Sequence, residues 1–148
     1  MQEKRINKIL LSCWNNLKAG NEQKSIPSLD QIKESELKDL WDDCFVINFD
    51  TKDYDYLGKN IKAIANGTGM VAKNIYENLL SPESNNLQAI IEQVITSESP
   101  LIQDAEFTNE HNVNIKYRRC FLPIKDEKGN TSLVLGGIRW IYIAKSLK

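Results

Sequence analysis

The last third of the chain contains three stretches in which apolar side chains alternate with a period of two, as they do in β-strands. These stretches lie at residues 101–109, 112–124 and 132–144, and only short polar segments separate them. Strands joined by such short turns must pair mainly antiparallel. The final stretch, SLVLGGIRWIYIA, is apolar on both faces, which is typical of a central strand. The chain therefore predicts an antiparallel sheet.

The segment NGTGMVAKN, residues 66–74, matches the glycine pattern G-x-G-x-x-A of dinucleotide-binding loops. Such a loop needs a strand before it and a long helix after it, within a parallel strand–helix–strand unit. The preceding segment NIKAIAN has helical spacing instead. We therefore predict that the glycines only turn the chain. Asn66 and Gly67 favour a positive φ where one short helix ends, and Thr68 caps the next helix.

The N-terminal half predicts short helices and two strands. The spacing of Ser28 and Gln31 fits a capping box, and a second short helix is expected from Ser35. The segment CFVINFD predicts a strand, and YDYLG predicts its neighbour. One face of the first strand carries Phe45, Ile47 and Phe49. Helices then follow, so the order is helix, two strands, helices, three strands, in one domain of 148 residues.

Residues 4–19 predict an amphipathic helix that ends at Gly20. Its apolar stripe consists of Ile6, Ile9, Leu10, Cys13 and Leu17. A helix with one apolar stripe needs a cover, which can be its own domain or a second copy of the chain. We expect a homodimer, and deletion of residues 1–20 should then yield a soluble monomer. The candidates for the dimer interface are Ile6, Ile9, Leu10 and Leu17.

Charge and hydropathy argue against several classes of partner. The net charge is −1, so no general attraction to nucleic acid or to an anionic membrane is expected. The strongest basic cluster is Lys116, Arg118 and Arg119, which fits a solvated or paired strand face. No apolar run approaches the ~20 residues that a membrane-spanning helix needs. No signal peptide is visible either.

The three cysteines, Cys13, Cys44 and Cys120, are widely spaced and form no C-x-x-C pair. This pattern is typical of buried thiols in a reducing compartment, so we expect a cytoplasmic protein. Acid pairs such as Asp53 and Asp55 match no calcium-loop spacing. We therefore expect no metal site.

Several segments, taken in order, resemble a PAS domain. They are the N-terminal helix with Trp14, then IPSLDQI, LKDLWDDCFVINFD, YDYLGKNI, YRRCFLPI and LVLGGIRW. More narrowly, residues 8–145 resemble a stand-alone PAS family of alphaproteobacteria. The resemblance implies an α+β fold: a PAS-like five-stranded antiparallel sheet with helices on one face, preceded by the N-terminal amphipathic helix. It also implies a division into residues 1–20, a dimerisation element, and residues 21–148, the PAS-like domain.

The resemblance also implies a ligand pocket between the sheet and its helices. Its lining, carried over by position, is Phe45, Ile47, Ile64, Ile75, Tyr117, Leu135 and Trp140. Plain core packing is the favoured explanation for each of these residues. The chain lacks the reactive-cysteine helix of flavin photoreceptors, and its only histidine, His111, lies in a polar turn that does not suit haem. No cofactor is therefore expected.

An alternative is a small enzyme or carrier on a similar α+β fold. Such a protein would need an ionisable residue deep in the pocket, and Arg119 continues the inward alternation of its strand. A buried arginine must be paired, by Asp50, by Glu106 or by an anionic ligand. We add Arg119 to the pocket candidates and predict no catalytic residue.

The sequence thus favours a signalling PAS module, a sensor or adaptor that acts by protein–protein contact and not as an enzyme. Its expected partners are a second copy of itself and an unidentified signalling protein, with a small-molecule ligand as a further option. Neither nucleic acid nor membrane is expected as a partner. The apolar character of the pocket candidates favours an adaptor with a closed core.

Overall fold

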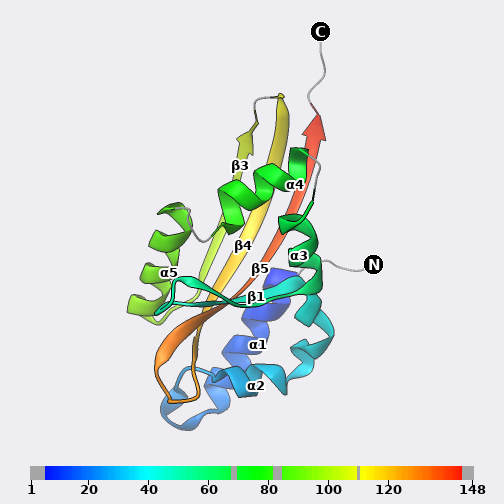
Figure 1. Ribbon diagram of the computed structural model, residues 1–148. Coiled ribbons are helices and arrows are strands. Elements are labelled where there is room, and N and C mark those ends of the chain that lie inside the picture. The colour runs from blue at the N-terminus through cyan, green and yellow to red at the C-terminus, as the bar shows by residue number, and fades with distance from the viewer. Residues whose placement is uncertain (1–5, 68–69, 82–84, 110, 145–148) are drawn as a thin grey trace.

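Five strands form one antiparallel sheet in the order β2-β1-β5-β4-β3 (Figure 1). The structure, a computed structural model, describes residues 6–67, 70–81, 85–109 and 111–144. The strands are β1 (Cys44–Asn48), β2 (Asp53–Leu57), β3 (Leu101–Thr108), β4 (Val113–Lys125) and β5 (Thr131–Ala144). Because β5 lies between β1 and β4, it is central, as its two apolar faces predicted. The α+β fold with a five-stranded antiparallel sheet is confirmed.

Helices lie over both faces of this sheet (Figure 1). One face is covered by α3 (Lys59–Ala65), α4 (Met70–Ile75), the π-helical η3 (Tyr76–Leu80) and α5 (Asn85–Ser97). The opposite face is covered by α1 (Ile6–Gly20), α2 (Leu29–Lys33) and the 3-10 helix η2 (Glu36–Asp43), with the short η1 (Glu22–Lys24) following α1. The helices after β2 thus cover one face as predicted, and the N-terminal helix covers the other.

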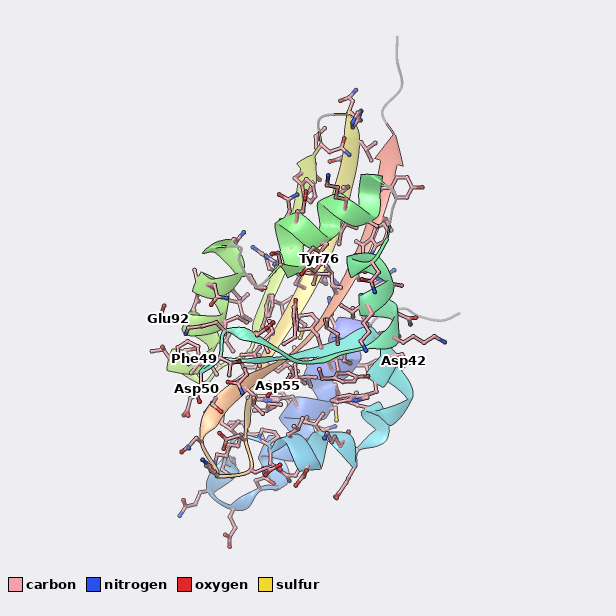
Figure 2. The ribbon with its side chains drawn as sticks, in the orientation of Figure 1. Asp42, Phe49, Asp50, Asp55, Tyr76 and Glu92 are labelled. Atoms are coloured by element: carbon pink, nitrogen blue, oxygen red, sulfur yellow. The ribbon has the colours of Figure 1, made fainter. Side chains whose placement is uncertain are left out.

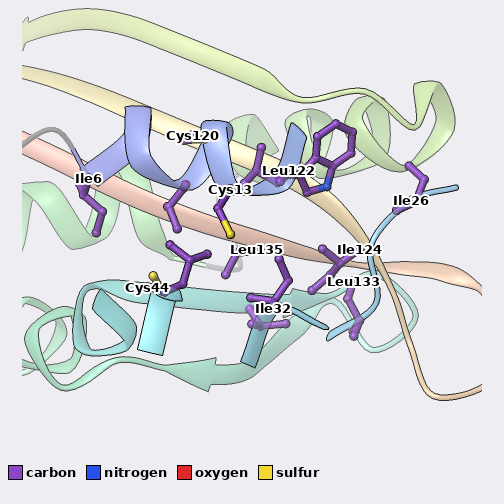
Figure 3. Packing of buried hydrophobic residues seen from close by; sticks show 14 residues of the cluster. Ile6, Cys13, Ile26, Ile32, Cys44, Cys120, Leu122, Ile124, Leu133 and Leu135 are labelled. Carbon is purple, nitrogen blue, oxygen red and sulfur yellow. The ribbon is translucent and has the colours of Figure 1, made fainter. Parts of the chain in front are cut away.

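Two hydrophobic cores therefore share the sheet. The α1-side core is Ile6, Leu10, Cys13, Trp14, Ile26, Ile32, Leu37, Cys44, Val46, Cys120, Leu122, Ile124, Leu133 and Leu135 (Figure 3). The α5-side core is Phe45, Ile47, Ile61, Ile75, Leu79, Leu80, Leu87, Ile90, Ile91, Val94, Ile115, Phe121, Val134 and Ile138. Successive residues of a strand point to opposite faces, so neighbours in β1, β4 and β5 alternate between the two cores.

Helix α1 is tied to the sheet by apolar and polar contacts. Leu10 is fully buried, and the Trp14 indole Nε1 donates a hydrogen bond of 2.7 Å to the Pro123 carbonyl. Gly137 makes room for this packing, since an added Cβ would lie 2.7 Å from a Leu10 methyl group. Its neighbour Gly136 does the same on the other face, where a Cβ would clash with the Phe45 ring.

The candidates for the dimer interface have unequal surroundings. Ile6 and Leu10 are buried in the α1-side core, and Leu17 packs against it. Ile9 is 41% exposed. The apolar stripe is thus covered mainly by the chain's own sheet. The homodimer was expected because this stripe needed a cover, so that reason no longer holds. The homodimer itself stays a prediction. The predicted division between residues 1–20 and 21–148 would cut through the α1-side core, which contains residues from both parts.

The local signals for helix starts are confirmed. Ser28 accepts a hydrogen bond from the Gln31 backbone, and the Gln31 side chain accepts one from the Ser28 backbone, which completes the capping box. Ser35 caps η2 by accepting a hydrogen bond from Leu37. None of the described helices has the length and apolar character needed to cross a membrane.

The glycine segment turns the chain between two helices, as predicted, but its backbone differs from the prediction. Asn66 ends α3 at φ −97°, and Gly67 does not have a positive φ. Gly67 is needed for a close approach instead, because an added Cβ would lie 2.6 Å from the Ala72 side chain in α4. Thr68 and Gly69 lie outside the described residues. A helix, not a strand, precedes the glycines, so the dinucleotide interpretation is excluded.

Candidate functional site

The structure brings most of the predicted pocket residues together in the α5-side core. Phe45, Ile47 and Ile75 are buried there, and Arg119 is 0% exposed. Three further candidates pack against this core and are partly buried: Ile64, Tyr117 and Trp140. The site is therefore the sheet face under α3, α4, η3 and α5, where a PAS pocket was expected.

Leu135 does not belong to this group. It lies in the α1-side core, opposite Val46 and Leu122 in the strand ladder. The ladder from Leu133 to Ala144 has no register shift, so Leu135 and Trp140, an odd number of residues apart, point to opposite faces. The prediction for Leu135 is wrong, and Val134 is the buried β5 residue next to it that faces the site.

Arg119 points into the core, as predicted, but its partners are neutral. Its Nε and one terminal nitrogen, Nη2, donate to the Gln103 side-chain oxygen, the former at 2.9 Å. Its Nη1 donates to the Leu79 carbonyl at 3.0 Å. The predicted pairing with Asp50 or Glu106 is wrong.

The surroundings of these two carboxylates explain the difference. Asp50 is exposed in the turn after β1 (Figure 2). Glu106 stands between Ala105 and Phe107 in β3 and points away from the α5-side core.

The buried guanidinium lies between aromatic rings. Its central carbon is 5.3 Å from the ring centroids of both Tyr117 and Phe121, which is the range of a cation–π contact. Burial lowers the pKa of Arg119, and the neighbouring Tyr117 and Tyr54 act in the opposite direction. An arginine remains charged in a protein, so the core holds a positive charge. The acceptor oxygens of Gln103 and Leu79 and the two aromatic rings compensate this charge.

The π-helix η3 is held by the same group of residues. Tyr54 in β2 donates its hydroxyl to the Leu80 carbonyl at 2.5 Å, next to the Leu79 carbonyl that Arg119 binds. Burial raises the pKa of Tyr54, so its hydroxyl remains a donor at neutral pH. The last carbonyl groups of a helix have no hydrogen-bond partner within that helix. Arg119 and Tyr54 satisfy two of them and fix η3 on the sheet.

Other groups with chemical potential are not assembled into a site. All three cysteines are free and buried, and burial raises the pKa of Cys44 and Cys120 to about 12, which keeps them as unreactive thiols. Among the described residues, no group of His, Cys, Asp and Glu side chains could hold a metal ion. Asp42 and Asp55 are exposed and lie apart (Figure 2).

The outer half of the sheet forms a second feature, on the face that α1 covers only in part. We call it the open surface; its residues are Ile102, Asp104, Glu106, Lys116, Arg118, Arg139 and Ile141. Ile141 is 55% exposed, and Arg118 binds Asp104 across the strands with an Nε–Oδ1 distance of 2.5 Å. A shallow hollow of about 490 Å³ runs over this surface.

Sequence reasoning missed Gln103, the main partner of Arg119. A signal for it was present, since a tight turn around His111 places Gln103 directly opposite Arg119 in the β3–β4 hairpin. The carbonyl groups of Leu79 and Leu80 had no such signal, because a π-helix is not visible in a hydrophobic pattern.

Several solved structures are similar to this chain at low sequence identity. The chain is similar to a sensory box sensor histidine kinase from Vibrio cholerae, with 18% identity, a TM-score of 0.47, and coverage of 72% of this chain and 90% of that chain. It is also similar to the PAS domain of the fruit-fly ELK potassium channel, with 14% identity, a TM-score of 0.46, and coverage of 75% and 94%. No curated protein sequence matches.

A protein-family model gives the stronger result. The model described as "PAS domain" matches residues 2–139, from before α1 into β5. This range includes α1, the strands β1 to β4 with Arg119, and β5 as far as residue 139. The chain therefore belongs to the PAS domain family.

Proposed function

We propose that this PAS domain is a signalling module that acts by protein contact, and that its α5-side core is structural rather than a ligand site. The observation that carries the proposal is the state of Arg119. It is a fully buried cation in this core, and each of its three side-chain nitrogens already binds a protein acceptor. A ligand site would need polar groups that are available to the ligand.

The open surface supports contact with a protein. It combines exposed isoleucines with charges of both signs, and the acids are on β3 whereas the bases are on β4 and β5. A two-fold axis parallel to the strands would place β3 of one copy over β5 of another, acid against base. We propose a second copy of the chain as its first partner, with the interface on this surface rather than on the α1 stripe.

Two exposed isoleucines provide a matched test. Ile141 is on the open surface and Ile9 is on the outer side of α1, so a glutamate at either position costs little folding stability. We expect the unsubstituted protein to be dimeric in light scattering. Ile141→Glu should weaken the dimer by at least about tenfold, because it buries a charge in the interface. Ile9→Glu should leave the dimer unchanged.

The converse results would overturn the proposed interface. Loss of the dimer in Ile9→Glu alone would assign the interface to α1, and a monomeric unsubstituted protein would exclude the homodimer. Native mass spectrometry beside a denatured spectrum tests the closed core. Extra mass that is lost on denaturation would show a retained ligand, and the chain would then be a sensor.

The remaining expectations are part of this proposal. They are cytoplasmic localisation, an unidentified signalling protein as the next partner, and membership of the stand-alone alphaproteobacterial branch. The enzyme alternative required an ionisable group presented to a substrate. No observation on the described residues favours it, because Arg119 is engaged by Gln103 and Leu79.

A further inference from the structure

The outer side of β3 is a long and regular sheet edge. β3 is the last strand of the sheet and pairs only with β4, over all eight of its residues and without a register shift (Figure 1). No backbone hydrogen bond joins its outer side to any other described part of the chain. The opposite edge strand, β2, has only five residues, and its ladder is irregular between Val46 and Ile47. Of the two edges, β3 is therefore the better template for another strand.

The β3–β4 hairpin determines which backbone groups of β3 point outward. Just beyond the strand, the Asn109 N–H donates to the Val113 carbonyl at 3.0 Å, so these two residues form a hydrogen-bonded pair. Along an antiparallel ladder, such pairs alternate with pairs whose backbone groups point away from each other. The odd-numbered residues of β3 therefore bind β4. The even-numbered residues, among them Ile102, Asp104 and Glu106, direct their N–H and C=O groups to the outer edge.

The sequence of β3 protects this edge against only one kind of partner. Proteins commonly protect an exposed edge with a lysine, a proline or a bulge, and the strand LIQDAEFT has none of these. Its only charged residues are Asp104 and Glu106, both exposed and both at outward-pointing positions. In the well-overlapped antiparallel registers of two copies of β3, an acid lies opposite an acid, which is destabilising. The acids therefore oppose self-pairing and leave the edge open to a basic strand.

An added strand would meet different side chains on its two faces. One face carries Asp104, which binds Arg118, and Glu106, which has no ion-pair partner within the described residues. The other face carries Ala105, which is exposed, and Phe107, which is half-buried. A residue directly opposite an acid would project from the same face as that acid. The edge thus matches a strand in which basic and apolar side chains alternate.

We propose that the outer edge of β3 binds an extended segment of a partner protein as an additional antiparallel strand. In this segment lysine or arginine alternates with apolar residues, so that its bases lie opposite Asp104 and Glu106 and its apolar side chains lie beside Ala105 and Phe107. Backbone hydrogen bonds supply the affinity of such a strand addition, and the alternating side chains supply its specificity. The inference rests on the proposed function, since it names the surface and the chemistry by which the next signalling partner would bind.

Hydrogen exchange measured by NMR tests the edge directly. The probe is a capped peptide as long as β3 in which lysine and valine alternate. In the free protein, the N–H groups of Asp104 and Glu106 should exchange rapidly, whereas those of Gln103 and Ala105 should exchange slowly because they bind β4. Saturating peptide should slow exchange at Asp104 and Glu106 by about tenfold or more and should leave Gln103 and Ala105 unchanged. Unchanged exchange at Asp104 and Glu106 would overturn the inference.

Two methylated peptides separate backbone pairing from charge. Methylation of the lysine backbone nitrogens removes the donors that face β3 in the antiparallel arrangement, whereas methylation of the valine nitrogens alters groups that face away. The two peptides have the same charge and composition. We expect the lysine-methylated peptide to bind at least about tenfold more weakly, as the loss of two hydrogen bonds allows. Equal affinities, or the reverse order, would contradict strand addition in this orientation.

A charge reversal on the protein tests the choice of a basic partner. Glu106→Lys should weaken binding of the unmethylated peptide by about fivefold or more, because it places lysine opposite lysine. Glu127→Lys is the matched control: Glu127 is exposed in the turn after β4, at the far end of that strand from the β3–β4 hairpin. At physiological ionic strength this control should leave binding unchanged, since screening removes such distant effects. Equal weakening in both variants would show that only net charge matters.

Ile141→Glu keeps this inference separate from the homodimer. Ile141 is on β5, so its substitution leaves the backbone edge of β3 in place. Light scattering records the oligomeric state of each sample that is titrated with the peptide. Peptide binding by a monomeric protein would support strand addition while the homodimer fails. A dimer that does not bind the peptide would overturn strand addition and leave the homodimer standing.

Discussion

At the scale of single residues, Arg119 shows how a charge can be part of a hydrophobic core. Its guanidinium is fully buried between Tyr117 and Phe121 and is bound to Gln103 and Leu79, with no carboxylate among its partners in the described parts of the chain. Truncation therefore leaves the buried Leu79 carbonyl and the partly buried Gln103 side-chain oxygen without donors. The residue is therefore expected to matter for the stability of the fold.

Arg119→Met should lower the free energy of unfolding by about 3 kcal/mol, because each orphaned acceptor costs about 1–3 kcal/mol. Gln103→Leu in the same chain removes one of those acceptors, so the double variant should lose less than the sum of the two single losses. Urea unfolding of the four proteins measures this coupling. Strict additivity would show that Gln103 is not the partner that matters.

Asp126 is the residue whose charge should be visible in a pH profile. Its carboxylate accepts hydrogen bonds from the Ser132 hydroxyl at 2.7 Å and from the Asn130 and Lys128 backbones at 3.0 and 2.9 Å, within the β4–β5 turn. The Ser132 hydrogen bond, followed by those from the backbone, lowers the pKa of Asp126. A lowered pKa stabilises the fold above the unfolded-state value, and this stabilisation is lost as the pH falls through the folded-state value.

Asp126→Asn should therefore melt at a lower temperature than the unsubstituted protein at pH 7. The difference should shrink as the pH falls below about 4, the usual pKa of an aspartate in an unfolded chain, because the unfolded state then binds a proton that the folded state does not yet bind. Thermal unfolding followed by circular dichroism across this range is the measurement. Glu127→Gln, an exposed carboxylate in the same turn, is the control, and an equal effect in both variants would contradict the role of the turn bonds.

At the scale of elements, α1 is part of the core and not an appendage. Its buried side chains Leu10 and Trp14 belong to the same core as the sheet residues Cys120, Leu122 and Leu135. Figure 3 labels these three sheet residues. The sequence argument gave a soluble monomer after deletion of residues 1–20. The burial of this helix reverses that expectation, because deletion would expose an apolar sheet face.

Deletion of residues 1–20 should yield an aggregated or partly unfolded chain with lost near-UV circular dichroism. Trp14→Phe is the milder test: it leaves the Pro123 carbonyl without its donor and should lower the free energy of unfolding by about 1–2 kcal/mol. Ile9→Glu, on the exposed side of the same helix, should unfold like the unsubstituted protein. A deleted chain that remains folded and soluble would show that α1 is separable.

At the scale of the whole molecule, hydrophobic period and turn signals were enough to predict the order of elements and the antiparallel sheet. They could not assign helices to faces, because an amphipathic stripe shows that a helix buries one side without showing which side of a sheet receives it. Leu135 and Trp140 were both assigned to the pocket, although residues an odd number of positions apart on a regular strand point to opposite faces of the sheet. The two partners of Arg119 depend on different features. Gln103 follows from the register of the β3–β4 hairpin, which can be inferred from the sequence, whereas the Leu79 carbonyl depends on the π-helix η3, which cannot.

The alternation of two cores along β4 and β5 has a consequence for how this sequence can evolve. Removing or adding one residue inside either strand would exchange the side chains of the two cores beyond that point, including the roles of Gly136 and Gly137. A substitution in β4 or β5 changes the packing of only one core, whereas an insertion or deletion changes both cores at once. Related chains should therefore differ in length at the turns near residues 109–112 and 126–130, whereas β4 and β5 should keep a constant number of residues.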